Sequence, residues 1–272
     1  MAVGAYGRGM SETVAPEVVG SVAELWHFPV KSMQGTRVDA LDLTEKGAEG
    51  DRGWAVVDPA EGKVLSAKRW SQLLEATGGR GDDGTITVTL PGGSAHEAGD
   101  PATDAALSAW LDHEVRLIQP PAGDGLPYDL PTDAWDDTSP LWQFPGPPGG
   151  PFVDLAAAHL LTTASLRAAE ALRPESAWDV RRFRPNAVLD EAGEGFVEDA
   201  WVGRAVGVGD AVAEPFMPTV RCALPTRAQP GLAKDPDIAR TLRDGHDLNL
   251  GVYCNVSVAG RVRLGDDVTL AG

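Results

Sequence analysis

Short strand-like runs separated by turn residues are the feature of this sequence that most limits its fold. The clearest run covers residues 85–90, where threonine alternates with isoleucine, valine and leucine and glycines lie on both sides. Comparable runs occur at residues 22–30, 38–43, 54–58, 63–67, 115–118, 160–163, 187–189, 205–208, 211–214, 252–258 and 268–270. Short helices are expected at 104–111, 164–172 and 238–243, the second with Thr163 as its N-cap. Many short strands with few helices favour a mainly β protein, built on a barrel or a sandwich.

A stretch rich in proline and glycine separates two strand-bearing halves. Residues 119–150 are dense in Pro, Gly and Asp and end in the run Pro-Gly-Pro-Pro-Gly-Gly. Proline lacks a backbone donor and glycine weakens strands, so we expect a long loop here and no central strand or helix. Such a loop marks a domain boundary, although active-site loops also reach this length. The expected organisation is a flexible tail at 1–20, a first domain at 21–120, a loop at 121–152 and a second domain at 153–272.

The charge and the cysteine content exclude several classes of function. The formal net charge is −17 and the pI is about 4.6, which argues against nonspecific nucleic-acid binding and against docking on an anionic membrane. We find no apolar run of about 18 residues, so no membrane span is expected. Two cysteines are too few for a disulfide framework or a zinc cage. They indicate a reducing compartment, and a cytoplasmic location is expected.

Cys222 is the residue with the widest choice of chemistry. It follows Arg221, and a neighbouring positive charge favours the thiolate over the thiol. A thiolate attacks carbon, carries a persulfide or binds a soft metal. A cysteine hydrolase that pairs Cys222 with His246 is one alternative, because catalytic partners need not be close in sequence. Cys254 lies in an expected strand and is interpreted as a small buried hydrophobe, and His159, in an apolar context, as structural.

Three groups of basic residues are candidates for binding an anion. Residues 181–186 read Arg-Arg-Phe-Arg-Pro-Asn, which places three arginines in six residues of an acidic chain. The planar guanidinium suits phosphate because it donates two parallel hydrogen bonds. Lys31 and Ser32 follow one expected strand, and Asp51 and Arg52 precede another. The alternatives from residue type alone are a solvated arginine edge paired with acidic residues, and a surface ion pair of little energy.

Taken in order, several segments of the chain resemble one family. The N-terminal segments are 22–32 (Val-Ala-Glu-Leu-Trp-His-Phe-Pro-Val-Lys-Ser) and 50–54 (Gly-Asp-Arg-Gly-Trp). The C-terminal segments are 159–166, 182–186, 221–222, 249–253 and 262–266. In order and spacing they resemble MOSC-domain proteins, in the branch with an added N-terminal β-barrel that includes the mitochondrial amidoxime-reducing component and its bacterial relatives. The resemblance implies a mainly β fold of two entwined parts, an N-terminal MOSC-type β-barrel and a MOSC β-barrel with a few short helices.

The resemblance also implies roles for individual residues. Cys222 matches the cysteine that ligates molybdenum, and Arg221 and Tyr253 match residues beside the metal. The residues that match those holding the molybdopterin and its phosphate are Lys31, Ser32, Arg52, Asp154, Arg184 and Asn186. Where relatives carry hydroxyl residues after the aspartate, and in the animal enzymes a serine before Arg-Cys, this chain has Leu155, Ala156 and Val220. These departures bear on the cofactor geometry and on the substrate.

The activity implied by the resemblance is that of a molybdenum-dependent oxidoreductase. It would bind the molybdenum cofactor between the N-terminal Lys31 and Arg52 and the C-terminal Cys222, and reduce small N-hydroxylated or N-oxide compounds. The chain shows neither the ferredoxin domain nor the membrane anchor of some relatives, so the electrons are expected from a separate ferredoxin, flavoprotein or cytochrome. The alternative is a carrier of sulfur, as a persulfide, or of the cofactor, without redox turnover. Neither a nucleic acid nor a membrane is an expected partner.

Overall fold

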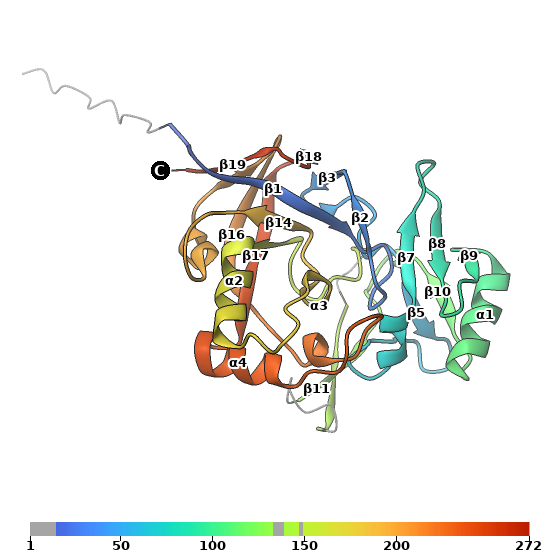
Figure 1. Ribbon diagram of the computed structural model, residues 1–272. Helices are drawn as coiled ribbons and strands as arrows, with labels where there is room; N and C mark the ends of the chain where they lie inside the picture. The colour runs from blue at the N-terminus through green and yellow to red at the C-terminus, as the bar shows by residue number, and fades with distance from the viewer. Residues whose placement is uncertain (1–14, 133–138, 147–148, 272) are drawn as a thin grey trace, which may run out of the picture.

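A closed barrel of seven strands forms the larger part of the protein (Figure 1). The computed structural model describes residues 15–132, 139–146 and 149–271. Around the barrel the strands follow the order β14 (Ala187–Asp190), β13 (Ala158–Thr162), β17 (Asn249–Val258), β16 (Ala211–Val220), β15 (Val206–Val208), β19 (Asp267–Leu270) and β1 (Glu17–His27). The pairing of β1 with β14 closes the ring, so the barrel has no free sheet edge except where β2 (Thr36–Val38) extends from β1.

The strand β1 joins the two halves of the chain. It is N-terminal in sequence, yet it lies between β19 and β14, with Glu17 opposite Leu270 and Leu25 opposite Ala187. A second N-terminal hairpin, β3 (Ala40–Thr44) with β4 (Gly47–Ala48), pairs with the C-terminal β18 (Gly260–Arg263). The two parts are therefore entwined, as the resemblance implied. Residues 17–20, expected in a flexible tail, belong to the barrel because they pair with β19; residues 1–14 lie outside the described part of the chain.

The remaining N-terminal strands form two smaller sheets with one helix, on the right of Figure 1. A five-stranded sheet has the order β10 (Arg116–Ile118), β5 (Ala55–Asp58), β6 (Lys63–Val64), β11 (Tyr128–Pro131) and β12 (Leu141–Phe144). The other contains β7 (Thr77–Arg80), β8 (Ile86–Thr89) and β9 (Ala95–Glu97). The helix α1 (Pro101–Leu111) and the short 3₁₀ turn η1 (Ser71–Glu75) share one core with both sheets, centred on the fully buried Leu73, Val88 and Leu107.

The interior of the barrel follows from the alternation of its strands. Leu25, Leu160, Val252 and Val268 are all buried in one apolar cluster that is contributed by both ends of the chain. Removing such side chains from water is the main favourable term in folding, about 25 cal/mol for each Å² of apolar surface. Cys254 is fully buried in the same cluster, which confirms its interpretation as a small hydrophobe.

Five short elements stand outside the barrel wall on the C-terminal side. The helices α2 (Thr163–Leu172) and α4 (Asp237–His246) pack beside each other, as Figure 1 shows. The others are α3 (Val180–Phe183) and the 3₁₀ turns η2 (Val197–Trp201) and η3 (Leu224–Thr226). Leu161, Ile238 and Leu242 are fully buried between these elements and the barrel. No helix within the described ranges has both the length and the apolar composition to cross a membrane.

The proline-rich stretch at 119–150 is more ordered than expected. It contains the hairpin of β11 and β12, and β11 lies inside its sheet because Tyr128 pairs in parallel with Val64. The expectation of a strandless loop was therefore wrong. The physical reason is that 128–131 and 141–144 are free of glycine, and that Tyr128 is buried against Phe144, with ring centroids 5.3 Å apart.

Several element boundaries also differ from the expected ones. The helix α1 begins at Pro101 because the Asp100 side chain accepts a hydrogen bond from the Ala102 amide at 2.8 Å. The cap of α2 is Thr162, one residue earlier than expected, and its hydroxyl accepts from the Ser165 amide. The strand β16 continues to residue 220 instead of ending at 214, which brings the end of this strand directly to Arg221 and Cys222.

Candidate active site

One pocket contains all nine residues that the sequence singled out as a site. It lies between the two halves of the chain and is lined by Lys31, Ser32, Arg52, Asp154, Arg184, Asn186, Arg221, Cys222 and Tyr253. They come from the loop after β1, the turn after β4, the segment before β13, the end of α3, the end of β16 and the strand β17. Residues separated by up to about 220 positions in sequence therefore meet at one place.

The backbone at three of these residues has a conformation that sequence patterns do not reveal. Ser32, Arg52 and Arg184 have φ values of 70°, 50° and 57°, in the left-handed region that non-glycine residues rarely adopt. Main-chain hydrogen bonds hold two of these turns, from the Arg52 amide to the Phe28 carbonyl at 2.7 Å and from the Arg184 amide to the Val180 carbonyl at 3.1 Å. Such strained residues cluster at functional sites, and here three of them line one pocket.

The pocket lining carries a large excess of positive charge. Among the described residues, its cations are Lys31, Arg52, Lys68, Arg184 and Arg221, and its one carboxylate is Asp154. Burial lowers the pKa of Arg184 to about 9, and the neighbouring Arg52 adds to the effect, so Arg184 stays protonated at neutral pH. Burial also lowers the pKa of Arg221. In a chain of net charge −17, this concentration of buried cations is suited to binding an anion.

Asp154 lies between two lysines of the N-terminal half. Its Oδ1 atom is 2.5 Å from Lys31 Nζ and its Oδ2 atom is 3.1 Å from Lys68 Nζ. Although burial acts to raise it, these two ammonium groups hold the pKa of Asp154 well below its usual range. Lys31 also donates to the Phe152 carbonyl at 2.9 Å and lies 4.7 Å from the centre of the Tyr128 ring. This cluster ties the segment before β13 to the N-terminal half.

Asp51 and Arg52 form a buried ion pair, so their interpretation as a surface pair was wrong. Asp51 is only 4% exposed, and it also accepts hydrogen bonds from the Phe28 amide at 2.7 Å and from Asn186 Nδ2 at 3.1 Å. Asn186 in turn accepts a hydrogen bond from the His159 amide through its Oδ1. Both ends of the Asn186 amide are therefore engaged in holding the pocket wall together.

Arg221 and Cys222 leave the end of β16 and enter the pocket. The Arg221 amide donates to the Leu248 carbonyl at 2.7 Å, and Arg221 Nη2 donates to the Phe183 carbonyl at 2.8 Å. Arg221 Nε is buried and, within the described residues, has no hydrogen-bond partner. Cys222 is partly exposed. A partly exposed thiol beside an unsatisfied buried donor is an arrangement that a ligand with an acceptor atom would complete.

Three further polar residues line the pocket that the sequence did not single out as a site. Ser66 and Lys68 lie just after β6, in a run without any recognised motif. His159, interpreted as structural, has a buried Nε2 atom without a hydrogen-bond partner in the described part of the chain. Burial, with Arg221 and Arg52 in addition, lowers its pKa well below the ordinary value, so the imidazole is neutral. Gly251, at φ 81°, passes so close that a Cβ atom there would lie 2.4 Å from His159 Nε2.

Two family matches together span both halves of the chain. Residues 19–115 match the family described as "MOSC N-terminal beta barrel domain", and residues 150–269 match the family described as "MOSC domain". The chain belongs to the MOSC-domain family. The seven-stranded barrel and the few short helices agree with this assignment, and the mainly β fold expected from the sequence is confirmed.

Similar proteins with curated names include amidoxime-reducing components. The MOSC protein is 25% identical to mitochondrial amidoxime-reducing component 1 of Homo sapiens, over 93% of this chain and 84% of the relative. It is 24% identical to mitochondrial amidoxime reducing component 2 of Bos taurus, over 92% of this chain and 83% of the relative. Among solved structures, the YuaD protein of Bacillus subtilis aligns with a TM-score of 0.46 and 12% identity over 94% of both chains.

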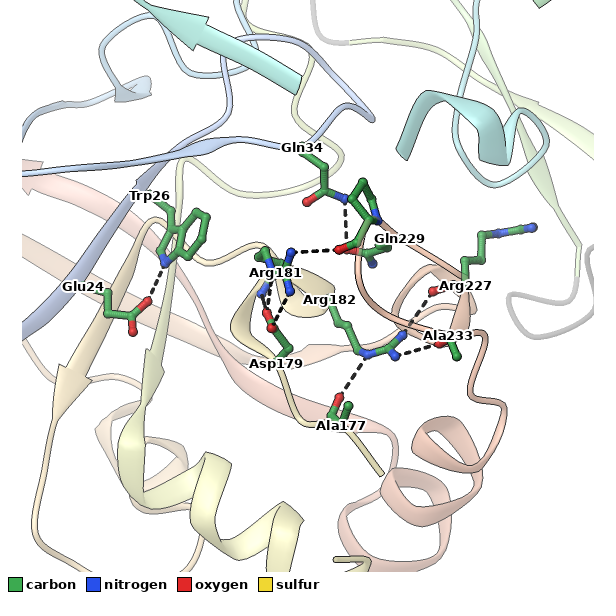
Figure 2. Close-up of polar contacts among 11 residues, drawn as sticks. Glu24, Trp26, Gln34, Ala177, Asp179, Arg181, Arg182, Arg227, Gln229 and Ala233 are labelled. Atoms are coloured by element: carbon green, nitrogen blue, oxygen red, sulfur yellow. Dashed lines mark hydrogen bonds and ion pairs between the residues drawn. The ribbon is translucent and has the colours of Figure 1, made fainter. Parts of the chain in front are cut away.

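The three arginines at 181–184 of the MOSC protein have three different functions in the structure. Only Arg184 lines the pocket. Arg181 forms an ion pair with Asp179 at 2.7 Å, drawn in Figure 2. Arg182 is almost fully buried. Arg182 donates hydrogen bonds of 2.8–3.1 Å to the carbonyls of Ala177, Pro225, Arg227 and Ala233. The arginine cluster is therefore neither a solvated edge nor a single phosphate site.

The loop that follows Cys222 is also held from the N-terminal half. Gln34 Nε2 donates to Gln229 Oε1 at 2.9 Å, a buried contact drawn in Figure 2. Arg227 Nη2 donates to the Lys68 carbonyl at 2.6 Å. Together with Arg182, these contacts fix the segment between η3 and α4 on three sides. The loop that follows Cys222 is thus held by side chains from both halves of the MOSC protein.

His246 is not the partner of Cys222. It is absent from the pocket lining, and its Nε2 atom is 2.6 Å from Asp199 Oδ2 while its Nδ1 atom is 2.8 Å from the Asn249 carbonyl oxygen. The ring also stacks on Phe196, with centroids 3.5 Å apart. Two acceptors, one at each ring nitrogen, suit the doubly protonated imidazolium. The hydrolase interpretation is therefore wrong. His246 links α4 to η2 through its contact with Asp199.

The free energy of unfolding is expected to fall as the pH rises above about 6.5. Although burial acts to lower it, the hydrogen bonds to Asp199 and Asn249 raise the pKa of His246 above its ordinary value. A group with a raised folded-state pKa stabilises the fold fully below its unfolded pKa and loses this effect as the pH rises through the folded value. Burial raises the pKa of Glu198 too, and this carboxyl acts in the same direction from its ordinary value of 4.5 upward.

Urea unfolding at a series of pH values checks this expectation. The wild-type protein should lose stability from about pH 6.5 upward, and His246→Gln should lack that part of the pH dependence. The Glu198 contribution, at lower pH, should remain in the variant. Parallel curves for the two proteins above pH 6.5 would show that His246 is not charged in the native state.

Proposed function

We propose that this MOSC protein binds the molybdenum cofactor and reduces N-hydroxylated or N-oxide compounds with electrons from a separate protein. The observation that carries the proposal is the pocket between the two halves, where one thiol lies among five cations of a strongly acidic chain. The names of the amidoxime-reducing relatives support the same substrate class. A soft thiolate suits molybdenum, and guanidinium and ammonium groups suit the phosphate of the cofactor.

The residues present fit that cofactor. Cys222 is partly exposed within the lining and would hold the metal through its sulfur. Arg184 and Lys31 are buried cations that would hold the phosphate. The buried Arg221 Nε atom has no partner among the described residues, so it can donate a hydrogen bond to the cofactor. Neutral His159, with its own unpaired Nε2 atom, would contact the organic part of the cofactor. Burying these groups away from water costs free energy, and pairing with a ligand would offset that cost.

The reaction breaks one N–O bond. An N-hydroxylated substrate takes up two electrons and two protons and is released as the reduced nitrogen compound and water. The cofactor, when bound, supplies the two-electron redox chemistry, and a separate redox protein supplies the electrons. The chain provides hydrogen bonds at the pocket wall. Burial raises the pKa of Tyr253, so its hydroxyl keeps its proton and remains a hydrogen-bond donor at neutral pH.

Reconstitution tests the proposed function. Purified protein incubated with excess molybdenum cofactor is expected to retain about one molybdenum per chain after gel filtration. The loaded protein should then convert benzamidoxime to benzamidine with a chemical electron donor, while a sample without added cofactor should not. Stoichiometric metal without any turnover on amidoximes or N-oxides would contradict the redox function and leave a binding role.

A persulfide carrier is the second candidate, and the partial exposure of Cys222 favours it, because a sulfur donor could reach the thiol. Mass spectrometry decides between the two after incubation with an organic persulfide, which transfers its outer sulfur to the thiol and is released as a thiol. One extra sulfur atom on Cys222, combined with no retained molybdenum, would support the carrier. A thiol without extra sulfur in a protein that retains molybdenum supports the oxidoreductase.

A further inference from the structure

The mouth of the pocket differs in chemistry from its floor. Leu155 and Val220 both line the pocket, and they are 58% and 52% exposed. Lys31, Arg184 and Arg221, which line the same pocket, are at most 8% exposed. Cations therefore lie deep and apolar side chains lie at the entrance. Covering exposed leucine and valine surface is favourable, so the entrance suits a ligand with an apolar body.

Of the two lysines in the pocket lining, Lys68 has more hydrogen-bonding capacity left. An ammonium group has three donors, and within the described residues Lys68 Nζ has one hydrogen-bond partner, Asp154 Oδ2 at 3.1 Å. Lys31 uses the other oxygen of the same carboxylate and the Phe152 carbonyl. One carboxylate is thus shared by two ammonium groups, which leaves a net charge of +1. Within the described residues Lys68 has two unused donors and Lys31 has one, so Lys68 is the lysine better able to donate to a further group.

The backbone of Lys68 is held in place by both halves of the chain. Its carbonyl accepts the 2.6 Å hydrogen bond from Arg227, and its amide donates to Ser66 Oγ at 3.3 Å. The Lys68 side chain is 13% exposed, between the values of the floor and those of the mouth. A lysine with a fixed backbone and free donors, next to exposed apolar side chains, is a ready-made site for an anionic group on an otherwise apolar ligand.

We propose that Lys68, Leu155 and Val220 form a substrate subsite that takes an apolar molecule bearing a carboxylate. This inference rests on the proposed function, since the molecule is the N-hydroxylated substrate itself. Its apolar body lies on Leu155 and Val220, and its carboxylate accepts a hydrogen bond from Lys68. The net charge of −17 repels anions from most of the surface, so an anionic substrate is attracted only where cations gather.

Two substrates of the same shape test the subsite. The cofactor-loaded protein is assayed with 4-carboxybenzamidoxime and with the neutral 4-carboxamidobenzamidoxime. The wild type is expected to show a kcat/KM about tenfold higher for the carboxylate, the size of one charge-assisted hydrogen bond in a partly exposed site. In Lys68→Met this ratio should fall to about one through a higher KM for the carboxylate, and Lys68→Arg should restore most of it. Lys46→Met, which removes an exposed lysine outside the pocket lining, should keep the wild-type ratio.

A substitution of Val220 tests the apolar part of the subsite. Val220→Ser is expected to raise KM severalfold for both substrates, because it removes apolar contact without touching the charge. An unchanged KM for both would overturn the role of the mouth. Equal kcat/KM values for the two substrates in the wild type would overturn the role of Lys68. Loss of molybdenum from Lys68→Met would also overturn it, because Lys68 would then hold the cofactor.

A binding measurement separates this inference from the proposed function. If the loaded wild type reduces neither amidoxime, the proposed function fails, and calorimetry with the unreactive 4-carboxybenzamidine and 4-carboxamidobenzamidine on the same protein still tests the subsite. Tighter binding of the carboxylate by the wild type, lost in Lys68→Met, supports the subsite. Equal binding of the two amidines overturns it.

Discussion

Replacing Cys222 with alanine is expected to abolish molybdenum retention and amidoxime reduction. Even outer-shell partners of metal ligands are worth about 10- to 100-fold in affinity or activity, so loss of the proposed ligand itself should lower kcat/KM by more than about 100-fold. The fold should be unaffected, because Cys222 is partly exposed and such substitutions usually change stability by less than about 0.5 kcal/mol. Metal analysis and the fluorescence of the oxidised pterin measure the loss directly.

The second cysteine provides the matched control. Cys254→Ala removes a thiol that is fully buried in the barrel interior, so it is expected to cost about 1 kcal/mol of stability and to leave the metal content unchanged. A Cys222→Ala protein that still holds one molybdenum per chain would show that sulfur ligation from this residue is not required. Pterin retained without metal would instead place Cys222 at the metal and the cations at the organic part.

Replacing Arg182 with methionine is expected to destabilise the protein by about 4 kcal/mol. Methionine fills the volume, but the four carbonyls that Arg182 contacts lose their donor, and each buried polar group left without a partner costs about 1–3 kcal/mol. Burial lowers the pKa of Arg182, with Asp235 and Asp179 opposing the effect. Because three of these carbonyls belong to the loop after Cys222, the variant should also retain less cofactor. Urea unfolding and hydrogen exchange of residues 223–233 measure the two effects.

Arg181 provides the control, because its replacement by methionine removes the same charge from the adjacent position. Arg181→Met removes an ion pair that is about one-third exposed, so a loss below about 1 kcal/mol is expected. Arg182→Lys keeps the charge but lacks the planar fork, and its stability should lie between those of the wild type and Arg182→Met. Equal stabilities of Arg181→Met and Arg182→Met would contradict the function assigned to the buried guanidinium.

Residue types and their order were enough to find most of the pocket. Lys31, Arg184 and Cys222 belong to segments whose order resembles one family, and each of them lines the same cavity. Lys68 could not be found in this way, because its significance depends on Asp154, 86 residues further along the chain. The sequence also could not predict that Arg184 lines the pocket while Arg182 is buried in the wall. The helix α3 ends at Phe183, and Arg184 follows it in a left-handed conformation.

The sequence by itself determined that the chain is mainly β, that it has two halves and that a cysteine and several cations are the candidate residues of a site. These properties are local, because the alternation of apolar and polar residues, the turn residues and the residue types can be recognised in short segments of the sequence. Only the tertiary structure decided that residues 17–27 close the C-terminal barrel, that residues 128–131 form an inner strand and that Asp51 is buried. Each of these depends on partners distant in sequence, because strand pairing and burial are settled by the balance of desolvation, hydrogen bonding and chain entropy over the whole molecule.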